Sequence, residues 1–174
     1  MDNKEIDQII LDIPHNEFAF HELYVKTKTI VFAYIMSIVK NYDDSSDVLQ
    51  ETYIKIYLAS HHYESMKKPL AWIYTIARNE SYLYLRRKKL NQEYDDNCAF
   101  PQDMDIKNKL YLEQLFEVLN EKERQIIIMH SLWGFKHYEI ANLLDIPLAT
   151  SLSSYRRGMK KMKEIGGQVY EETL

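Results

Sequence analysis

Hydrophobic positions recur with a helical period along most of the chain, and short polar turns separate the segments that they define. Residues 5–13 place Ile6, Ile9 and Ile10 on one side of a predicted helix that ends at Pro14. Apolar residues between 18 and 39 continue at mainly helical spacing, which predicts either one long helix or two consecutive helices. The pattern is typical of an all-α protein.

A further helix is predicted to follow the polar turn at residues 41–46. At 100° per residue its two faces differ in chemistry. The first face has the composition of a core stripe and consists of Val48, Leu49, Thr52, Tyr53, Ile56 and Ala59. The opposite face is acidic at its start and apolar further along, and it consists of Asp47, Gln50, Glu51, Ile54, Tyr57 and Leu58. It could dock another protein through an apolar centre and a charged rim. It could equally be covered by a neighbouring helix of the same chain.

The helix predicted from Pro69 is basic towards its end. Its apolar side carries Trp72, Ile73, Ile76 and Leu83. Its other side alternates aromatic and cationic side chains at a spacing of four, namely Tyr74, Arg78, Tyr82 and Arg86. Flat rings that stack bases and cations that hold phosphates are what single-stranded nucleic acid requires. The alternative is an amphipathic helix whose long cationic stems lie over the core.

The second half of the chain begins after residues 91–107, a polar and acidic stretch that is predicted to be a linker. A helix over 110–119 follows. Asn120 and Glu123 then have the spacing of a capping box for the next helix. Two short helices joined by a turn at residues 145–147 complete the chain, which is the helix-turn-helix arrangement.

The last of these helices has a regular apolar stripe, which we expect to face the core: Leu148, Leu152, Tyr155, Met159 and Met162. Its other side begins with small residues and continues with cations, in the order Ala149, Ser153, Arg156, Arg157, Lys160, Lys161 and Lys163. This order suits a recognition helix that meets bases with its first turns and phosphates with later ones. An ordinary amphipathic surface helix would also fit.

Bulk properties narrow the function classes. The formal net charge is −4, so any affinity for nucleic acid must come from local basic segments. Cys98 is the only cysteine, which excludes an intramolecular disulfide. We find no signal peptide or membrane span and expect a cytoplasmic protein. His61 and His62 lack a third ligand at suitable spacing. With no phosphate loop, metal set or nucleophile–base pair, we expect neither an enzyme with catalytic residues nor a cofactor.

Several ordered motifs are similar to those of one bacterial family. Asp-Val-Leu-Gln-Glu-Thr-Tyr at 47–53, Trp-Ile-Tyr-Thr-Ile-Ala-Arg-Asn at 72–79 and Leu-Arg-Arg-Lys-Lys at 85–89 resemble the second conserved region of extracytoplasmic-function (ECF) RNA polymerase sigma factors. Leu-Asn-Glu-Lys-Glu-Arg at 119–124, Gly-Phe at 134–135 and Glu-Ile-Ala at 139–141, followed by Ile-Pro at 146–147 and Thr150, resemble the fourth region.

The resemblance implies two small helical domains, a region 2-like bundle at 1–90 and a region 4-like helix-turn-helix at 108–174, joined by the acidic linker at 91–107. It implies RNA polymerase core, promoter DNA and an anti-sigma protein as partners, with no small-molecule substrate and no membrane insertion. The implied polymerase-binding residues are Asp47, Gln50, Glu51, Ile54 and Leu58. The implied DNA-binding residues are Trp72, Tyr74, Arg78, Asn79, Tyr82, Arg86, Arg87, Lys88, Ala149, Thr150, Ser153, Ser154, Arg156, Arg157 and Lys160. In the family, the loop before the basic helix accommodates a flipped promoter base, and Tyr63 lies in that loop here.

The chain also departs from the family pattern. Residues 149–154 read Ala-Thr-Ser-Leu-Ser-Ser, where the family usually has Gly-Thr-Val-Lys-Ser-Arg. Leu83 stands where an aspartate is frequent, and Asp145 stands in place of a frequent glycine. Two alternatives therefore stay open. The chain could bind polymerase after losing promoter reading, or it could be a free-standing helix-turn-helix regulator.

Overall fold

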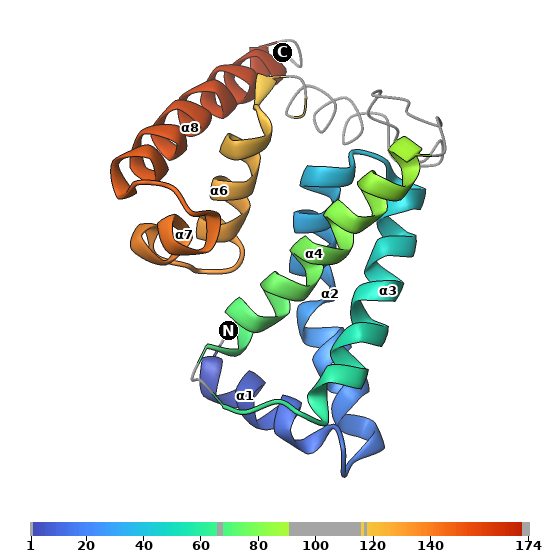
Figure 1. The fold of residues 1–174 in the computed structure, drawn as a ribbon. Helices are drawn as coiled ribbons and strands as arrows, with labels where there is room; N and C mark the ends of the chain where they lie inside the picture. The colour runs from blue at the N-terminus through green and yellow to red at the C-terminus, as the bar shows by residue number, and fades with distance from the viewer. Residues whose placement is uncertain (1, 66–67, 91–115, 117, 172–174) are drawn as a thin grey trace. The chain divides into compact units, whose positions relative to one another are not determined.

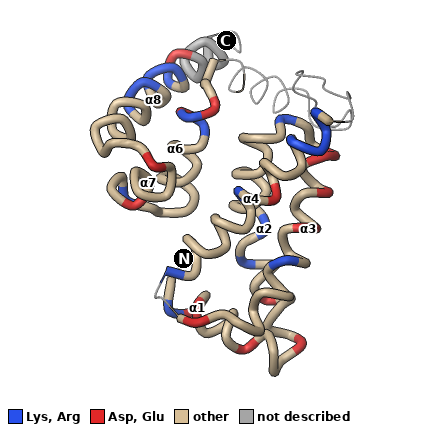
Figure 2. Tube along the Cα trace, in the orientation of Figure 1, with Lys and Arg blue, Asp and Glu red and all other residues tan. Residues whose placement is uncertain are grey.

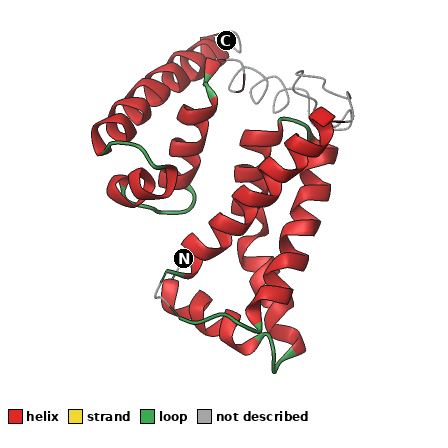
Figure 3. Ribbon diagram, viewed as in Figure 1, coloured by secondary structure: helices red, strands yellow, loops and turns green. Residues whose placement is uncertain are grey.

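The fold is all-α over the residues described by the computed structural model, which are 2–65, 68–90, 116 and 118–171, with side chains up to 164 (Figures 1 and 3). This confirms the predicted fold class. Contacts divide the chain into two units, each described by itself below. The first contains α1 (Asn3–Asp12), α2 (Glu17–Val39), α3 (Tyr42–Ser60) and α4 (Pro69–Leu90). The second contains α6 (Glu121–Ser131), α7 (His137–Leu144) and α8 (Leu148–Glu171). The predicted linker at 91–107 lies outside the described residues.

The first unit begins with two capped helices. The Asp2 side chain accepts a hydrogen bond from the backbone N–H of Lys4, and the Asn16 side chain accepts one from the N–H of Phe18. Asn16 is therefore the predicted cap of α2. The apolar run at 18–39 forms one continuous helix rather than two. The predicted apolar side of α1 is fully or almost fully buried, at Ile6, Ile9 and Ile10.

The helix α3 packs on α2 through aromatic side chains. The Tyr53 ring lies edge-on to Tyr24, with ring centroids 4.8 Å apart, and its hydroxyl lies 2.6 Å from that of Thr27. Both hydroxyls are buried, so each needs a partner inside the protein. The predicted core face of α3 is confirmed, with Ala59 half-buried and all other members buried.

The core face of α4 differs from the prediction. Its buried residues are Pro69, Leu70, Ile73, Tyr74, Ala77 and Ser81. Trp72, Ile76 and Leu83, which were predicted to form the apolar side, are only half-buried. Tyr74 is 1% exposed, and its hydroxyl accepts a hydrogen bond from Tyr34 of α2 at 3.1 Å. It therefore belongs to the core rather than to an exposed aromatic ladder.

The second unit opens on the predicted capping box, which is present. The Asn120 side chain accepts from the backbone N–H of Glu123 at 2.9 Å, and Glu123 accepts from the N–H of Asn120 at 3.2 Å. The turn between α7 and α8 contains Asp145 with φ of 53°, in the left-handed region. This backbone conformation explains why glycine suits the position.

The prediction of a buried apolar stripe on α8 is wrong for three of its five members, while Tyr155 and Met162 are half-buried. Leu148, Leu152 and Met159 are 47%, 36% and 39% exposed. The core-facing side of the helix instead consists of Ser151, Ser154 and Gly158. A Cβ added at Gly158 would lie 2.6 Å from Cδ1 of Ile127 on α6. The two helices therefore approach closely through small residues, and Leu148, Leu152 and Met159 are left on the outside of α8.

Candidate functional site

The outward face of α3 is exposed as one continuous surface, which we call the α3 face: Asp47, Gln50, Glu51, Ile54, Tyr57 and Leu58. Ile54, Tyr57 and Leu58 are 51%, 44% and 58% exposed. The described helices of the first unit do not cover these three side chains. The alternative that a neighbouring helix of this unit covers the face is therefore excluded. The surface combines an apolar centre with acidic side chains at one end, as a protein-docking surface does.

A small groove separates α3 from α4 at the acidic end of the α3 face. It is lined by Asp47, Val48, Glu51, Glu80, Leu83, Tyr84 and Arg87. Close by, Lys88 Nζ lies 2.7 Å from Asp44 Oδ2 and ties the end of α4 to the start of α3. Lys88 was predicted to bind DNA, but its ammonium group already has this partner. Arg86, Arg87 and Lys89 are exposed, and cations gather at this end of α4 (Figure 2).

Arg78 lies at the boundary between the core and the surface of α4, next to the exposed Asn79. Its guanidinium carbon lies 5.3 Å from the centre of the half-buried Tyr82 ring, in a cation–π arrangement. Its Nε is buried and has no hydrogen-bond partner among the described residues. Beneath it, burial raises the pKa values of Tyr34 and Tyr74, so both phenols stay neutral donors and acceptors. Because Nε is buried, a partner from outside could reach only other atoms of this half-buried side chain.

The loop before α4 is held by a residue from α1. Asp7 accepts hydrogen bonds from the Tyr63 hydroxyl at 2.6 Å and from the Ser65 hydroxyl. The Tyr63 ring in turn contacts Trp72, with centroids 4.8 Å apart. Burial, with the Asp7 carboxylate in second place, raises the pKa of Tyr63 and keeps it protonated. The result is an aromatic platform formed by the loop and the first turn of α4.

In the second unit, the outward side of α8 presents Ala149, Ser153, Arg156, Lys160 and Lys163, all exposed, while Thr150 is half-buried. Figure 2 shows the cations along this helix. Ser154, which was predicted to contact DNA, is 1% exposed and accepts a hydrogen bond from Arg157 at 3.2 Å. Its burial removes it from the surface that a duplex could reach.

Two cations of α8 serve the fold through Glu123, which is 1% exposed. Lys161 Nζ lies 2.8 Å from its Oε2, and Arg157 Nε lies 3.5 Å from its Oε1. Burial alone would raise the pKa of Glu123. The hydrogen bonds from Lys161 and from the Asn120 backbone, with both positive charges, outweigh burial and hold the pKa below its usual value.

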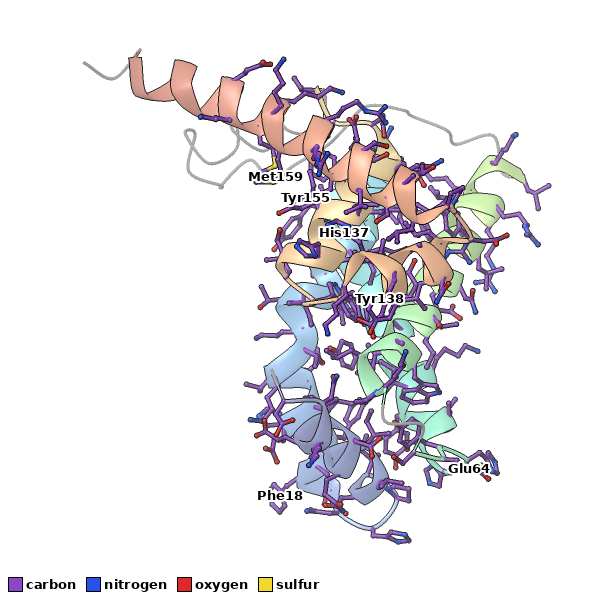
Figure 4. The ribbon with its side chains drawn as sticks, turned by 90° about the vertical axis from the view of Figure 1, so that its left-hand side faces the viewer. Phe18, Glu64, His137, Tyr138, Tyr155 and Met159 are labelled. Carbon is purple, nitrogen blue, oxygen red and sulfur yellow. The ribbon has the colours of Figure 1, made fainter. Side chains whose placement is uncertain are left out.

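A histidine pair joins the three helices of the second unit. The rings of His130 and His137 are stacked with centroids 4.5 Å apart, and Tyr155 lies edge-on to both. His137 Nδ1 lies 3.0 Å from the Ser151 hydroxyl. Burial, and then the neighbouring His130, lower the pKa of His137. Figure 4 shows His137 and Tyr155 on their helices.

Sequence reasoning missed Asp7 and the histidine pair. Asp7 lies far along the chain from Tyr63, and His130 and His137 sit on different helices. No local pattern indicates such contacts. Among the described residues no cluster of metal-ligating side chains is present, and no helix there is long and apolar enough to cross a membrane.

Comparison with known proteins identifies the class. The family model for Sigma-70 region 2 matches residues 23–90, and the model for Sigma-70 region 4 matches residues 109–162. The two matches in this order define a protein of the sigma-70 type. The chain is 24% identical over 158 residues to RNA polymerase sigma factor CarQ of Myxococcus xanthus, covering 87% of this chain and 91% of that protein. It is 20% identical over 173 residues to ECF RNA polymerase sigma factor SigX of Bacillus subtilis, covering 91% and 89%.

Two solved structures share the fold. The sigma factor RpoE, in complex with the anti-sigma factor NepR from Bartonella quintana, has a TM-score of 0.65 and 22% identity and covers 84% of this chain and 95% of that chain. CnrH in complex with the cytosolic domain of CnrY has a TM-score of 0.61 and 17% identity, covering 96% and 97%. The chain belongs to the ECF group of the sigma-70 family of RNA polymerase sigma factors. Sigma factors of this family are not enzymes.

Proposed function

We propose that three surfaces of this sigma factor each bind a different partner. The α3 face docks RNA polymerase core, α4 with the preceding loop holds the opened promoter strand, and α8 holds upstream duplex DNA. The observation that carries the proposal is the exposure of the α3 face, where Ile54 and Leu58 stand open beside Asp47 and Glu51. An exposed apolar centre of this kind indicates a partner.

Docking through the α3 face is supported by its energetics. Burying a leucine or isoleucine side chain contributes about 1.5–3 kcal/mol. Ile54 and Leu58 are both more than half exposed, so a partner can bury most of that surface. The carboxylates of Asp47 and Glu51 lie at one end, where they would orient a basic partner surface rather than supply most of the affinity.

Binding of the opened promoter strand by α4 is supported by the position of Arg78 and by the aromatic platform. Arg78 is only half-buried, and a hydrogen bond between its guanidinium and a phosphate oxygen would contribute about 1.5–3 kcal/mol. Trp72 is half-buried and packs on the buried Tyr63, so Trp72 is the ring of this platform that a base could reach. Separating stacked base pairs costs on the order of 1.4 kcal/mol per step. Each base stacked on an aromatic ring returns about 1–3 kcal/mol, so a few such contacts could offset several steps.

The proposal includes regulation by an anti-sigma protein in the cytoplasm. The solved structure of the sigma factor RpoE named above is a complex with the anti-sigma factor NepR. The α3 face offers an apolar surface that such a protein could cover in competition with polymerase. The inhibitor would then act by occluding the docking surface.

Run-off transcription with purified core polymerase and a library of randomised promoters tests the proposal. We expect defined transcripts that are lost with Arg78→Ala. The matched control is Lys89→Ala, which removes an exposed cation from the same helix and should retain most activity. Co-purification with core without any transcript would instead identify a sigma-like protein that has lost promoter reading. Absence of co-purification would favour a free-standing DNA-binding regulator.

A further inference from the structure

Three apolar side chains stand exposed on one side of α8, and we call them the α8 stripe: Leu148, Leu152 and Met159. At 100° per residue they fall within about 40° of one another around the helix. The side chain of Arg156 follows about 40° beyond Leu152, and it is exposed too. On the other side, the half-buried Tyr155 lies about 20° from Leu148. The stripe therefore lies between the cationic surface of the helix and its core-facing side.

The orientation of α8 is imposed by its opposite side. Ser151 and Ser154 are buried against the unit, and a side chain at Gly158 would have to displace the end of the Ile127 side chain. Lys161, on the same side, is held by Glu123 and by the Val118 carbonyl. Rotating the helix to bury the stripe would break these contacts, so the exposure of the stripe is a property of the fold.

The position of the stripe favours duplex DNA as its partner. It lies on the second helix of the helix-turn-helix, the element that enters the major groove in this arrangement. The exposed cations Arg156, Lys160 and Lys163 on the same helix complement phosphates. A leucine side chain cannot hydrogen-bond a base, and the major groove offers one apolar group, the C5-methyl of thymine.

We infer that the α8 stripe reads thymine methyl groups, with Leu152 as the principal specificity-determining residue and Leu148 in support. This inference rests on the proposed binding of upstream duplex by α8 and names the chemistry of that contact. The upstream promoter element then contains thymine opposite Leu152. Arg156 and Lys160 hold the flanking phosphates and set the register.

Deoxyuridine replacement isolates the methyl group. The full-length protein is combined with core polymerase, and an upstream element is first selected from a randomised library. Each thymine of that element is then replaced singly by deoxyuridine, which removes the methyl group and keeps the base pairing. We expect about a fourfold loss of binding and of transcript at one or two positions, the size of losing one buried methyl group.

Variants assign the effect to a side chain. Leu152→Ala should weaken binding to the thymine element and abolish its sensitivity to deoxyuridine at the same position. The matched control is Leu132→Ala, because Leu132 is also an exposed leucine of the second unit but caps the end of α6 and does not belong to α8. That variant should keep the full sensitivity. Both substitutions are at exposed positions, and circular dichroism checks that each variant is folded.

Each contrary outcome is distinct. Transcription that is indifferent to every deoxyuridine, or a selected element without thymine, would overturn the inference while leaving the sigma function standing. A third outcome combines two results: transcription is unaffected by every deoxyuridine, and Leu152→Asp abolishes binding to a protein partner. The stripe would then be a protein-docking surface. Failure of every library member to direct transcription would refute the proposed function, and the inference would fall with it.

Discussion

Removing the carboxylate of Glu123 should destabilise the helix-turn-helix unit far more than removing a neighbouring exposed carboxylate. Glu123 accepts hydrogen bonds from Lys161 at 2.8 Å and from the Asn120 backbone at 3.2 Å. A hydrogen bond to a charged group contributes about 1.5–3 kcal/mol, and a helix cap contributes about 1 kcal/mol. Glu123→Ala should therefore lower the free energy of unfolding by about 2.5–4 kcal/mol.

Glu121→Ala is the matched control. Glu121 lies in the same first turn of α6, but it is exposed, and its side chain accepts a hydrogen bond from Gln125 one turn later. We expect this variant to lose about 0.5 kcal/mol, the scale of an exposed charge near a helix N-terminus. The comparison separates the buried network from the general effect of a negative charge at that helix end.

The assay follows the fluorescence of one tryptophan, because the two tryptophans of the chain lie in different units. Trp133 is 4% exposed and reports on the second unit, while Trp72 belongs to α4. In a Trp72→Phe background, urea unfolding followed by Trp133 fluorescence gives the free energy of unfolding of the second unit. A difference of less than about 1 kcal/mol between Glu123→Ala and Glu121→Ala would refute the reasoning, because the network would then be energetically unimportant.

The Glu123 network also predicts a pH dependence. The pKa of this carboxyl is lower in the folded chain than its ordinary value of 4.5. The unfolded chain then binds the proton first, so the stabilisation is complete above about pH 4.5 and is lost as the pH falls below it. Glu123→Gln should remove this part of the pH dependence.

Single contacts give three further predictions. The pKa of His137 is lowered from 6.5 by folding, so the second unit should lose stability as the pH falls below about 6.5. Thermal melts between about pH 7.5 and 5.5 should show this loss of stability. His137→Gln should make the stability less dependent on pH over that range. Asp145→Gly should stabilise the unit by about 1 kcal/mol or less in urea titrations, because φ of 53° strains a non-glycine residue, whereas Asp145→Val should destabilise it. Asp7→Ala should weaken binding of the opened strand about fivefold through loss of the Tyr63 hydrogen bond, and Asp7→Asn should retain most of it in permanganate footprinting.

Helical periodicity was enough to predict the all-α fold and the two faces of α3. On α3 the large apolar residues of one face are buried together, so hydrophobicity and burial coincide there. On α8 they do not coincide. There Gly158 and its neighbouring serines allow a close approach to α6, and the larger side chains are left outside. A pattern that ranks residues by hydrophobicity cannot foresee a helix that packs through its smallest residues.

The candidate site was predictable only where its residues share one helix. The acidic and apolar members of the α3 face were found from their spacing, and their exposure agrees with that prediction. Tyr74 was misplaced because its partner Tyr34 lies on another helix. The same holds for Asp7, whose contact with Tyr63 joins segments that no local pattern connects. Such contacts depend on tertiary packing.

The affinity of the full-length protein for RNA polymerase core tests the central claim most directly. Leu58→Asp places a charge at the apolar centre of the α3 face, whereas Lys55→Ala alters an exposed neighbour on the same helix. Fluorescence anisotropy should show Kd raised by about 10- to 100-fold for Leu58→Asp, the loss expected from one buried leucine, and nearly unchanged for Lys55→Ala. Equal affinities for Leu58→Asp and the unaltered protein would show that polymerase docks elsewhere and would contradict the account.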